Sequence, residues 1–123
     1  MATDSAIETF ILDSFSSVWD LELLCTLLDH QEIALTHAQL VERMRSSELV
    51  VTQGAQALVA SGLAAFVEEG ALKFSPVNAD AAVCARQACD FYRRFPGRAR
   101  RLLVSRHSPG LNAFADAFRL RKD

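Results

Sequence analysis

Residues 35–76 carry the sequence LTHAQLVERMRSSELVVTQGAQALVASGLAAFVEEGALKFSP, and the order of short elements in it decides the fold. Thr36 and Gln39 have the spacing of a capping box, in which each side chain hydrogen-bonds the backbone N–H of the other residue. The box predicts a helix over residues 37–45, and the apolar side chains that this helix buries are Leu40, Val41 and Met44.

A second helix follows after a turn of only two residues. Ser46 and Ser47 supply the turn and an N-cap, so the helix is expected to begin at Glu48. It is expected to end at Ser61-Gly62, where a glycine readily adopts the left-handed conformation that closes a helix. The side chains on its apolar side are Val51, Ala55, Leu58 and Val59.

The residues on either side of the two helices favour short extended segments. Residues 33–35 are too few for a helix and predict a stub of strand. From Ala64 the pattern changes to that of a small hairpin, with a turn at residues 68–70 between the arms Phe66-Val67 and Leu72-Lys73-Phe74. The predicted order is therefore short strand, helix, tight turn, helix and hairpin.

This order resembles the winged helix-turn-helix of bacterial MarR-type transcriptional regulators and related proteins. The residues that carry the resemblance are Thr36, Leu40, the Ser46-Ser47 turn, Val51, Leu58 and the Gly62-Leu63 step into the hairpin. The resemblance implies a mostly α fold with a small β-hairpin wing and flanking N- and C-terminal helices. It also implies DNA binding by a dimer whose interface is built from the terminal helices.

Apolar side chains at helical spacing predict helices on both sides of the winged-helix segment. Upstream, helices are expected over residues 5–15 and 18–28. Downstream, Asn78 caps a helix that is interrupted at residues 96–97, and a basic stretch precedes a last short helix at 111–121. We expect one domain over residues 1–123, which comprises an N-terminal helix at 1–16, a winged helix-turn-helix at 17–76 and a C-terminal helical extension at 77–123.

The composition is that of a globular protein without a membrane segment. Of the 123 residues, 50% are hydrophobic and 23% are charged, which is enough to bury a core without disulfide staples. The chain has neither a long apolar run nor a basic leader segment, so we expect a soluble, cytoplasmic protein with no membrane partner.

The spacing of cysteine and histidine predicts no metal site. Cys25 and His30 are five residues apart, as are Cys84 and Cys89, and this spacing places each pair off a common helix face. Buried structural thiols are favoured, with a redox or ligand sensor at Cys84 and Cys89 as the alternative. The sequence has no nucleophile elbow, catalytic carboxylate pair, phosphate loop or dinucleotide fingerprint, so we expect neither an enzyme nor a bound cofactor.

Charge is divided unequally along the chain. Residues 1–80 hold twelve acids and three bases, a net charge of −9, whereas residues 81–123 hold three acids and ten bases, a net charge of +7. The arginines that crowd near the end are Arg93, Arg94, Arg98, Arg100, Arg101 and Arg106. They are expected to contact phosphate or to pair with the acidic N-terminal helices of the same or another chain, and an ordinary solvated face is the alternative.

In a winged helix that reads DNA, the outward side chains of the second helix meet base edges in the major groove. The outward positions are expected to be Glu48, Val50, Thr52, Gln53 and Gln56. The candidate DNA contacts, which add phosphate-binding groups, are Arg43, Arg45, Ser47, Thr52, Gln53, Gln56 and Lys73. Glu48, Glu68 and Glu69 would face a polyanion, and a solvated helix face is the alternative for the polar set.

Six of the eight phenylalanines lie outside the winged-helix segment, where a domain of this size leaves little core for them. We expect them to build a homodimer interface, and the candidate interface residues are Phe10, Phe15, Phe91, Phe95, Phe114 and Phe118. The alternative is that they fold back and enlarge the core of a monomer.

Two functions follow from these patterns. The first is a transcriptional regulator that binds operator DNA as a dimer. The second is a winged-helix adaptor that binds a partner protein and has little or no affinity for DNA. The order of elements favours the first function, and the charges on the second helix and the hairpin favour the second.

Overall fold

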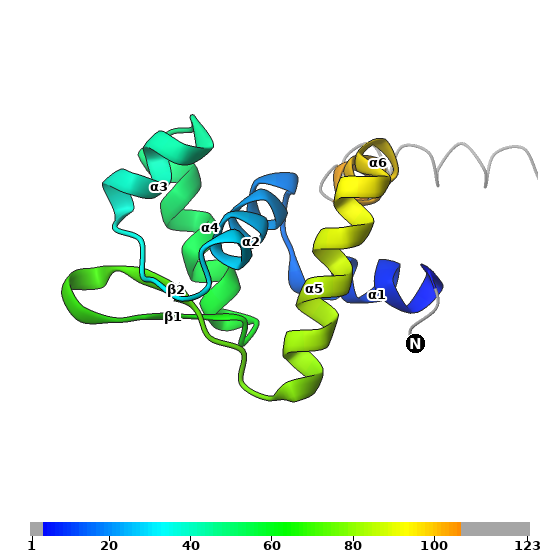
Figure 1. Cartoon of the computed structure of the whole chain (residues 1–123). Helices are drawn as coiled ribbons and strands as arrows, with labels where there is room; N and C mark the ends of the chain where they lie inside the picture. Colours follow the sequence, from blue (N-terminus) through cyan, green and yellow to red (C-terminus); the bar gives the residue numbers. More distant parts are fainter. Residues whose placement is uncertain (1–3, 107–123) are drawn as a thin grey trace, which may run out of the picture.

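A computed structural model describes residues 4–106, and within them a two-stranded hairpin lies among helices (Figure 1). The α-helices are α1 (Asp4–Ser14), α2 (Val18–Asp29), α3 (His37–Met44), α4 (Glu48–Ala60), α5 (Ala79–Arg94) and α6 (Pro96–Arg106). The hairpin consists of strands β1 (Ala64–Phe66) and β2 (Leu72–Phe74), which a 3₁₀ turn, η1 (Glu68–Gly70), connects. The fold is mostly α, with a winged-helix-like arrangement and flanking helices, as the sequence predicts. The helix predicted at 111–121 lies outside the described residues.

Side-chain caps set the starts of α3, α4 and α5. Thr36 Oγ1 accepts a hydrogen bond from Gln39 N at 3.2 Å, and Gln39 Oε1 accepts one from Thr36 N at 2.9 Å, so the predicted capping box is confirmed. Ser47 Oγ caps α4, and Asn78 Oδ1 caps α5 by accepting from Ala81 N at 2.8 Å. These caps satisfy N–H groups that have no partner inside a helix.

The end of α4 turns the chain into the hairpin. Gly62 has φ +74°, a left-handed conformation that any side chain would strain. A Cβ atom there would also lie 3.0 Å from Val77 Cγ1, because the chain returns past this point after β2. Val77 N donates to Gly62 O at 2.9 Å and thereby ties the two passes together.

The hairpin is antiparallel, and its register pairs Ala64 with Phe74, Ala65 with Lys73 and Phe66 with Leu72. The predicted strand stub at residues 33–35 is shorter than expected, since only Leu35 pairs. Leu35 and Leu72 exchange two backbone hydrogen bonds of 2.8 Å, and this single bridge fastens the segment before α3 to the wing.

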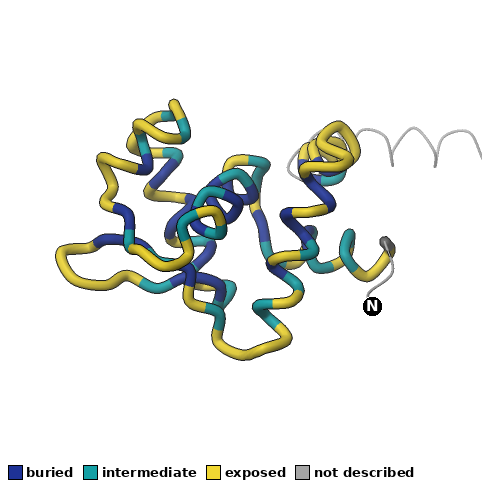
Figure 2. Tube along the Cα trace, viewed as in Figure 1, coloured by how far each residue is buried: buried dark blue, intermediate teal, exposed yellow. Residues whose placement is uncertain are grey.

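Helix α2 lies at the centre of the molecule (Figure 1). It contacts α3, α4 and β2 on one side and α5 and α6 on the other, while α1 packs against α5 and α6. The buried side chains of all six helices, which include Leu21, Leu24 and Leu27 of α2, form one cluster with those of the hairpin. Figure 2 shows the buried positions concentrated toward the centre of the molecule, where α2 lies. The flanking helices therefore extend the core of the winged helix.

This packing corrects the assignment of two phenylalanines to a dimer interface. Phe15 is 2% exposed and Phe91 is 3% exposed, so neither side chain has surface left for a second copy. Phe10 is half-buried against the same core, with its ring centroid 5.9 Å from that of Phe15. Phe95 remains 45% exposed. Two further candidates, Phe114 and Phe118, lie outside the described residues.

No helix within residues 4–106 is both long enough and apolar enough to cross a membrane.

Candidate nucleic-acid interface

The α3–α4 turn and the outward side of α4 hold six of the seven predicted DNA contacts. Arg43 lies in the last turn of α3, Arg45 ends that helix and Ser47 caps α4. The other three side chains recur at helical spacing on the outward side of α4, and they are Thr52, Gln53 and Gln56. All six residues are exposed.

Lys73, the seventh predicted contact, lies on a different element. It is half-buried on β2, where it pairs with Ala65 across the hairpin. A hollow beside it is lined by residues of the wing and of the segment before α3, which include Glu68, Glu69 and Ala34. The only cation of the wing therefore lies close to two carboxylate side chains.

One outward position of α4 differs from the prediction. Leu49 is 64% exposed, whereas Val50, which was expected to point outward, is half-buried. The reason is that α4 packs on α2 through Gly54 as well as through Val51 and Leu58, which rotates the buried side of the helix toward Val50. The outward side of α4 thus presents an apolar side chain among its polar ones.

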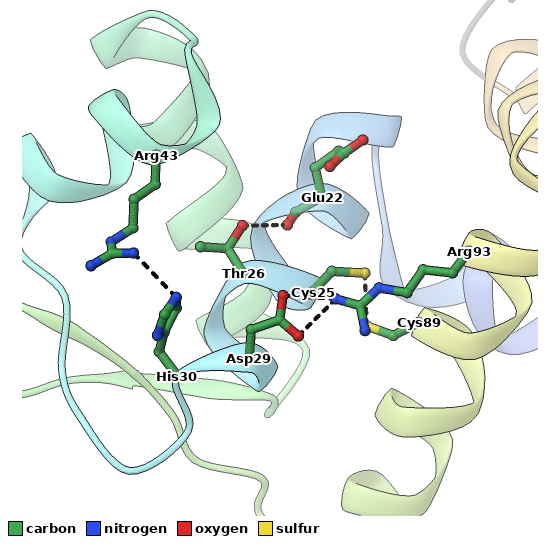
Figure 3. A network of polar contacts seen from close by, with 8 residues as sticks. All are labelled: Glu22, Cys25, Thr26, Asp29, His30, Arg43, Cys89 and Arg93. Atoms are coloured by element: carbon green, nitrogen blue, oxygen red, sulfur yellow. Dashed lines mark hydrogen bonds and ion pairs between the residues drawn. The ribbon is translucent and has the colours of Figure 1, made fainter.

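Arg43 already has a partner in this structure. Its Nη1 lies 3.2 Å from His30 Nε2 at the end of α2 (Figure 3). Because a guanidinium has no acceptor, the nitrogen donates and the histidine ring accepts. The contact is exposed, and it directs the guanidinium group toward the end of α2.

A pocket of about 480 Å³ lies between α4 and the start of α2, and sequence reasoning missed it. Its lining residues are Ser16, Ser17, Trp19, Asp20, Val50, Gln53 and Gln56. Trp19 is 42% exposed, so the two glutamines predicted to read bases lie near an accessible indole ring. No local signal marked this pocket: Trp19 lies one helical turn before Leu23, which is fully buried, so the exposure of the indole depends on how α4 packs on α2.

Carboxylates surround the basic residues of this face. Exposed acids lie on α3, at the start of α4 and at the wing tip, and they are Glu42, Glu48, Glu68 and Glu69. The bases on the same elements are Arg43, Arg45 and Lys73. Three bases against four acids give this face a small negative charge, which opposes the approach of a polyanion.

Two arginines of α5 and α6 pair with the acidic N-terminal helices of the same chain, which was one of the predicted alternatives. Arg93 Nη2 lies 2.8 Å from Asp29 Oδ1, and Arg98 forms an ion pair with Glu8 of α1. The basic C-terminal helices and the acidic N-terminal helices therefore bind each other directly. Exposed pairs of this kind stabilise a fold by about 0–1 kcal/mol, so they orient the helices more than they stabilise them.

The structure also brings together two cysteines that are far apart in the sequence. Cys25 of α2 and Cys89 of α5 are both buried, and their Sγ atoms lie 3.0 Å apart (Figure 3). The hydrogen bond with Cys25, followed by burial, raises the pKa of the Cys89 thiol well above its usual range. Within residues 4–106, no group of three His, Cys, Asp or Glu side chains is placed to hold a metal ion.

Comparison of the chain with known protein families, with curated proteins and with solved structures gives no match. The winged-helix-like arrangement therefore rests on the order of the elements, their caps and the hydrogen bonds of the hairpin. The observations that bear on function are the side chains and charges on the exposed face of α3, α4 and the wing.

Proposed function

We propose that the protein is a winged-helix transcriptional regulator that binds duplex DNA as a homodimer, with α4 in the major groove. The observation that carries the proposal is the arrangement of α4. Its polar outward side follows two exposed arginines, Arg43 in the last turn of α3 and Arg45 at the end of that helix. In helix-turn-helix proteins, the second helix reads bases while residues beside it bind phosphates. The order of elements, which resembles that of MarR-type regulators, supports the same function.

The residue types on α4 fit recognition of A·T pairs. A glutamine amide can donate to and accept from the N7 and N6 groups of adenine, and Gln53 and Gln56 are exposed on one side of the helix. Apolar side chains contact the thymine methyl group, which gives Leu49 a role in the groove. Thr52 adds a hydroxyl that both donates and accepts.

The charges imply that binding depends strongly on sequence. Non-specific affinity comes from neutralised phosphates, and this face offers few cations. The acidic wing tip, Glu68 and Glu69, opposes contact between the wing and the DNA backbone. We therefore expect weak binding to random duplex and a shallow dependence of affinity on salt.

The second candidate function is a winged-helix adaptor that binds a protein. The observation that favours it is the exposure of large apolar side chains on or near the same face, at Leu49, Phe66 and Trp19. Aromatic anchors beside a polar rim are typical of protein interfaces, and the glutamates that oppose DNA would suit a basic partner.

Binding to fluorescently labelled random duplex at low salt distinguishes the two functions. If α4 and its turn bind DNA, Arg43→Ala together with Arg45→Ala should weaken binding at least several-fold. Arg94→Ala together with Arg101→Ala is the matched control, because it also removes two exposed arginines, which lie on α5 and α6. Equal losses in the two variants would contradict the proposal, and a folded wild-type protein without affinity for duplex DNA would favour the adaptor.

A further inference from the structure

We propose that Cys25 and Cys89 form an intramolecular disulfide when the folded protein meets hydrogen peroxide. Their Sγ atoms lie 3.0 Å apart although the residues are 64 positions apart in the sequence. A disulfide joins two sulfurs at about 2.05 Å, so the bond needs an approach of about 1 Å. The inference does not rest on the proposed function, since it concerns a covalent link between α2 and α5.

Two polar contacts between α2 and α5 lie close to the thiols: along α2 they fall on either side of Cys25, and along α5 both fall within about one turn after Cys89. One turn further along each helix, Arg93 donates to both carboxylate oxygens of Asp29, at 2.8 and 2.9 Å (Figure 3). Near the start of α2, Tyr92 donates to Glu22. Because the two contacts lie on either side of Cys25, a shift of α5 along α2 in either direction would disturb one of them.

Burial determines the partner of each sulfur. Cys25 is 5% exposed and Cys89 is 3% exposed, so a sulfur that is oxidised between α2 and α5 meets the other thiol before any other nucleophile. Cys84 is half-buried and lies five residues before Cys89, off its face of α5. Thiolate is scarce at buried positions, so the reaction is slow, but the slow rate does not change which two sulfurs become linked.

The reaction balances with peroxide as the only oxidant. One thiol gives up its proton and attacks peroxide, the O–O bond breaks, and a sulfenic acid and a water molecule result. The second thiol attacks the oxidised sulfur, the S–S bond forms, the S–O bond breaks, and a second water molecule carries away the remaining thiol hydrogen. Two electrons pass from the sulfurs to the peroxide oxygens, and a thiol reductant reverses the change by exchange.

Trypsin separates the three cysteines, which makes the product easy to identify. The first basic residue of the chain is Arg43, so the peptides that hold Cys25, Cys84 and Cys89 are 1–43, 74–86 and 87–93. The folded wild-type protein is treated with peroxide, its remaining thiols are blocked, and the digest is analysed by mass spectrometry without reduction. We expect peptide 1–43 to be linked to peptide 87–93, with a mass lower by two hydrogen atoms than the sum of the two peptide masses. Dithiothreitol should release the two peptides from each other.

Single substitutions supply the controls. Cys84→Ser should leave the cross-link intact, whereas Cys25→Ala and Cys89→Ala should each abolish it. A cross-link to peptide 74–86, a cross-link between two chains, or unlinked peptides 1–43 and 87–93 after treatment would overturn the proposal. Because the decisive measurement uses the wild-type protein, it does not depend on how well a variant folds.

Discussion

Ser46 and Ser47 are neighbours in the turn between α3 and α4, but their hydroxyl groups have different surroundings. Ser47 Oγ accepts a hydrogen bond from Val50 N at 3.2 Å and so caps α4. Ser46 Oγ is buried, and it has no hydrogen-bond partner among residues 4–106. A buried hydroxyl without a partner lowers stability, whereas a capping hydroxyl raises it.

The same substitution at these two positions should therefore have opposite effects. Ser47→Ala is expected to lower the free energy of unfolding by about 1 kcal/mol through the lost cap. Ser46→Ala is expected to leave it unchanged or to raise it by up to about 1 kcal/mol, because it removes an unpaired polar group. Urea denaturation of both variants tests this, and similar losses in the two would contradict it.

Tyr92 is the only tyrosine in the chain, so its titration can be followed by ultraviolet absorbance. Burial raises its pKa, and the hydrogen bond to Glu22 raises it further. We expect the folded protein to titrate above the value of about 10 that is usual for an exposed tyrosine. Glu22→Gln should lower the pKa of Tyr92, but burial should keep it above that usual value.

The raised pKa of Tyr92 also determines how stability depends on pH. Below the pKa of the unfolded chain, tyrosine is protonated in both states and its full contribution to stability is present. As pH rises through the folded pKa, that contribution is lost, since the unfolded state releases its proton first. A folded-state titration at the ordinary value would contradict this account.

At the scale of elements, α2 and α4 approach each other closely at one point. Gly54 of α4 is buried against α2, and a Cβ atom there would lie 3.1 Å from Leu23 Cδ2 and 3.3 Å from Asp20 Oδ1. Both neighbours are buried and have little room to move. This approach determines which side of α4 faces outward, and with it which residues can meet a ligand.

Gly54→Val should therefore separate the two helices. We expect the free energy of unfolding to fall by about 2 kcal/mol, which is typical of an overpacked core. Gly97→Ala in α6 is the control, because a Cβ atom there meets only the flexible Arg101 side chain, at 3.4 Å, and stability should change by less than about 0.5 kcal/mol. Thermal unfolding of both variants checks the contrast.

The wing offers a second test at this scale. Glu68→Lys with Glu69→Lys converts two acids at the wing tip into two bases, and it should raise affinity for random duplex if the wing approaches DNA. The plot of log affinity against log salt should steepen by about 2 units, close to one for each added phosphate contact.

A matched control for the wing changes the net charge equally elsewhere. Asp13→Lys with Asp90→Lys places the same charges on exposed positions of α1 and α5. If this control raises the affinity as much as the wing variant does, the effect comes from net charge and the wing does not approach DNA.

At the scale of the whole molecule, some of the basic residues in the C-terminal part of the chain form ion pairs with acidic residues in its N-terminal part. Arg93 and Arg98 bind Asp29 and Glu8 of their own chain, so these two arginines need no partner subunit. Of the described candidates for a homodimer contact, Phe10 is half-buried, and Phe95, at the junction of α5 and α6, is exposed. The dimer stays a prediction, and it now depends on that junction.

Sedimentation at micromolar concentration should give a particle of twice the 13.5 kDa chain mass. Phe95→Ala should weaken the dimer about tenfold, because truncation of an interface aromatic commonly costs more than ~1 kcal/mol. Phe66→Ala on the wing, at 52% exposure against 45% for Phe95, should leave the dimer unchanged. A 13.5 kDa particle would contradict the dimer.

Much of the candidate interface followed from helical period alone, because exposure alternates predictably along a helix that packs on one side. Thr52, Gln53 and Gln56 are exposed as predicted. The sequence did not predict that Leu49 rather than Val50 is exposed, nor that a pocket lies at Trp19, since both depend on the angle at which α4 meets α2. That angle is set by contacts between residues far apart in the sequence.

The sequence by itself determined the elements whose signals are local. The capping box at Thr36, the caps at Ser47 and Asn78, the turn at Gly62 and the hairpin after it each depend on atoms within a few residues. Only the tertiary structure decided which phenylalanines are buried, that Arg93 meets Asp29, and that Cys25 meets Cys89. These outcomes depend on how α2 packs on α5 and α6. No local pattern encodes the relative position of helices that are separated by more than forty residues of intervening chain.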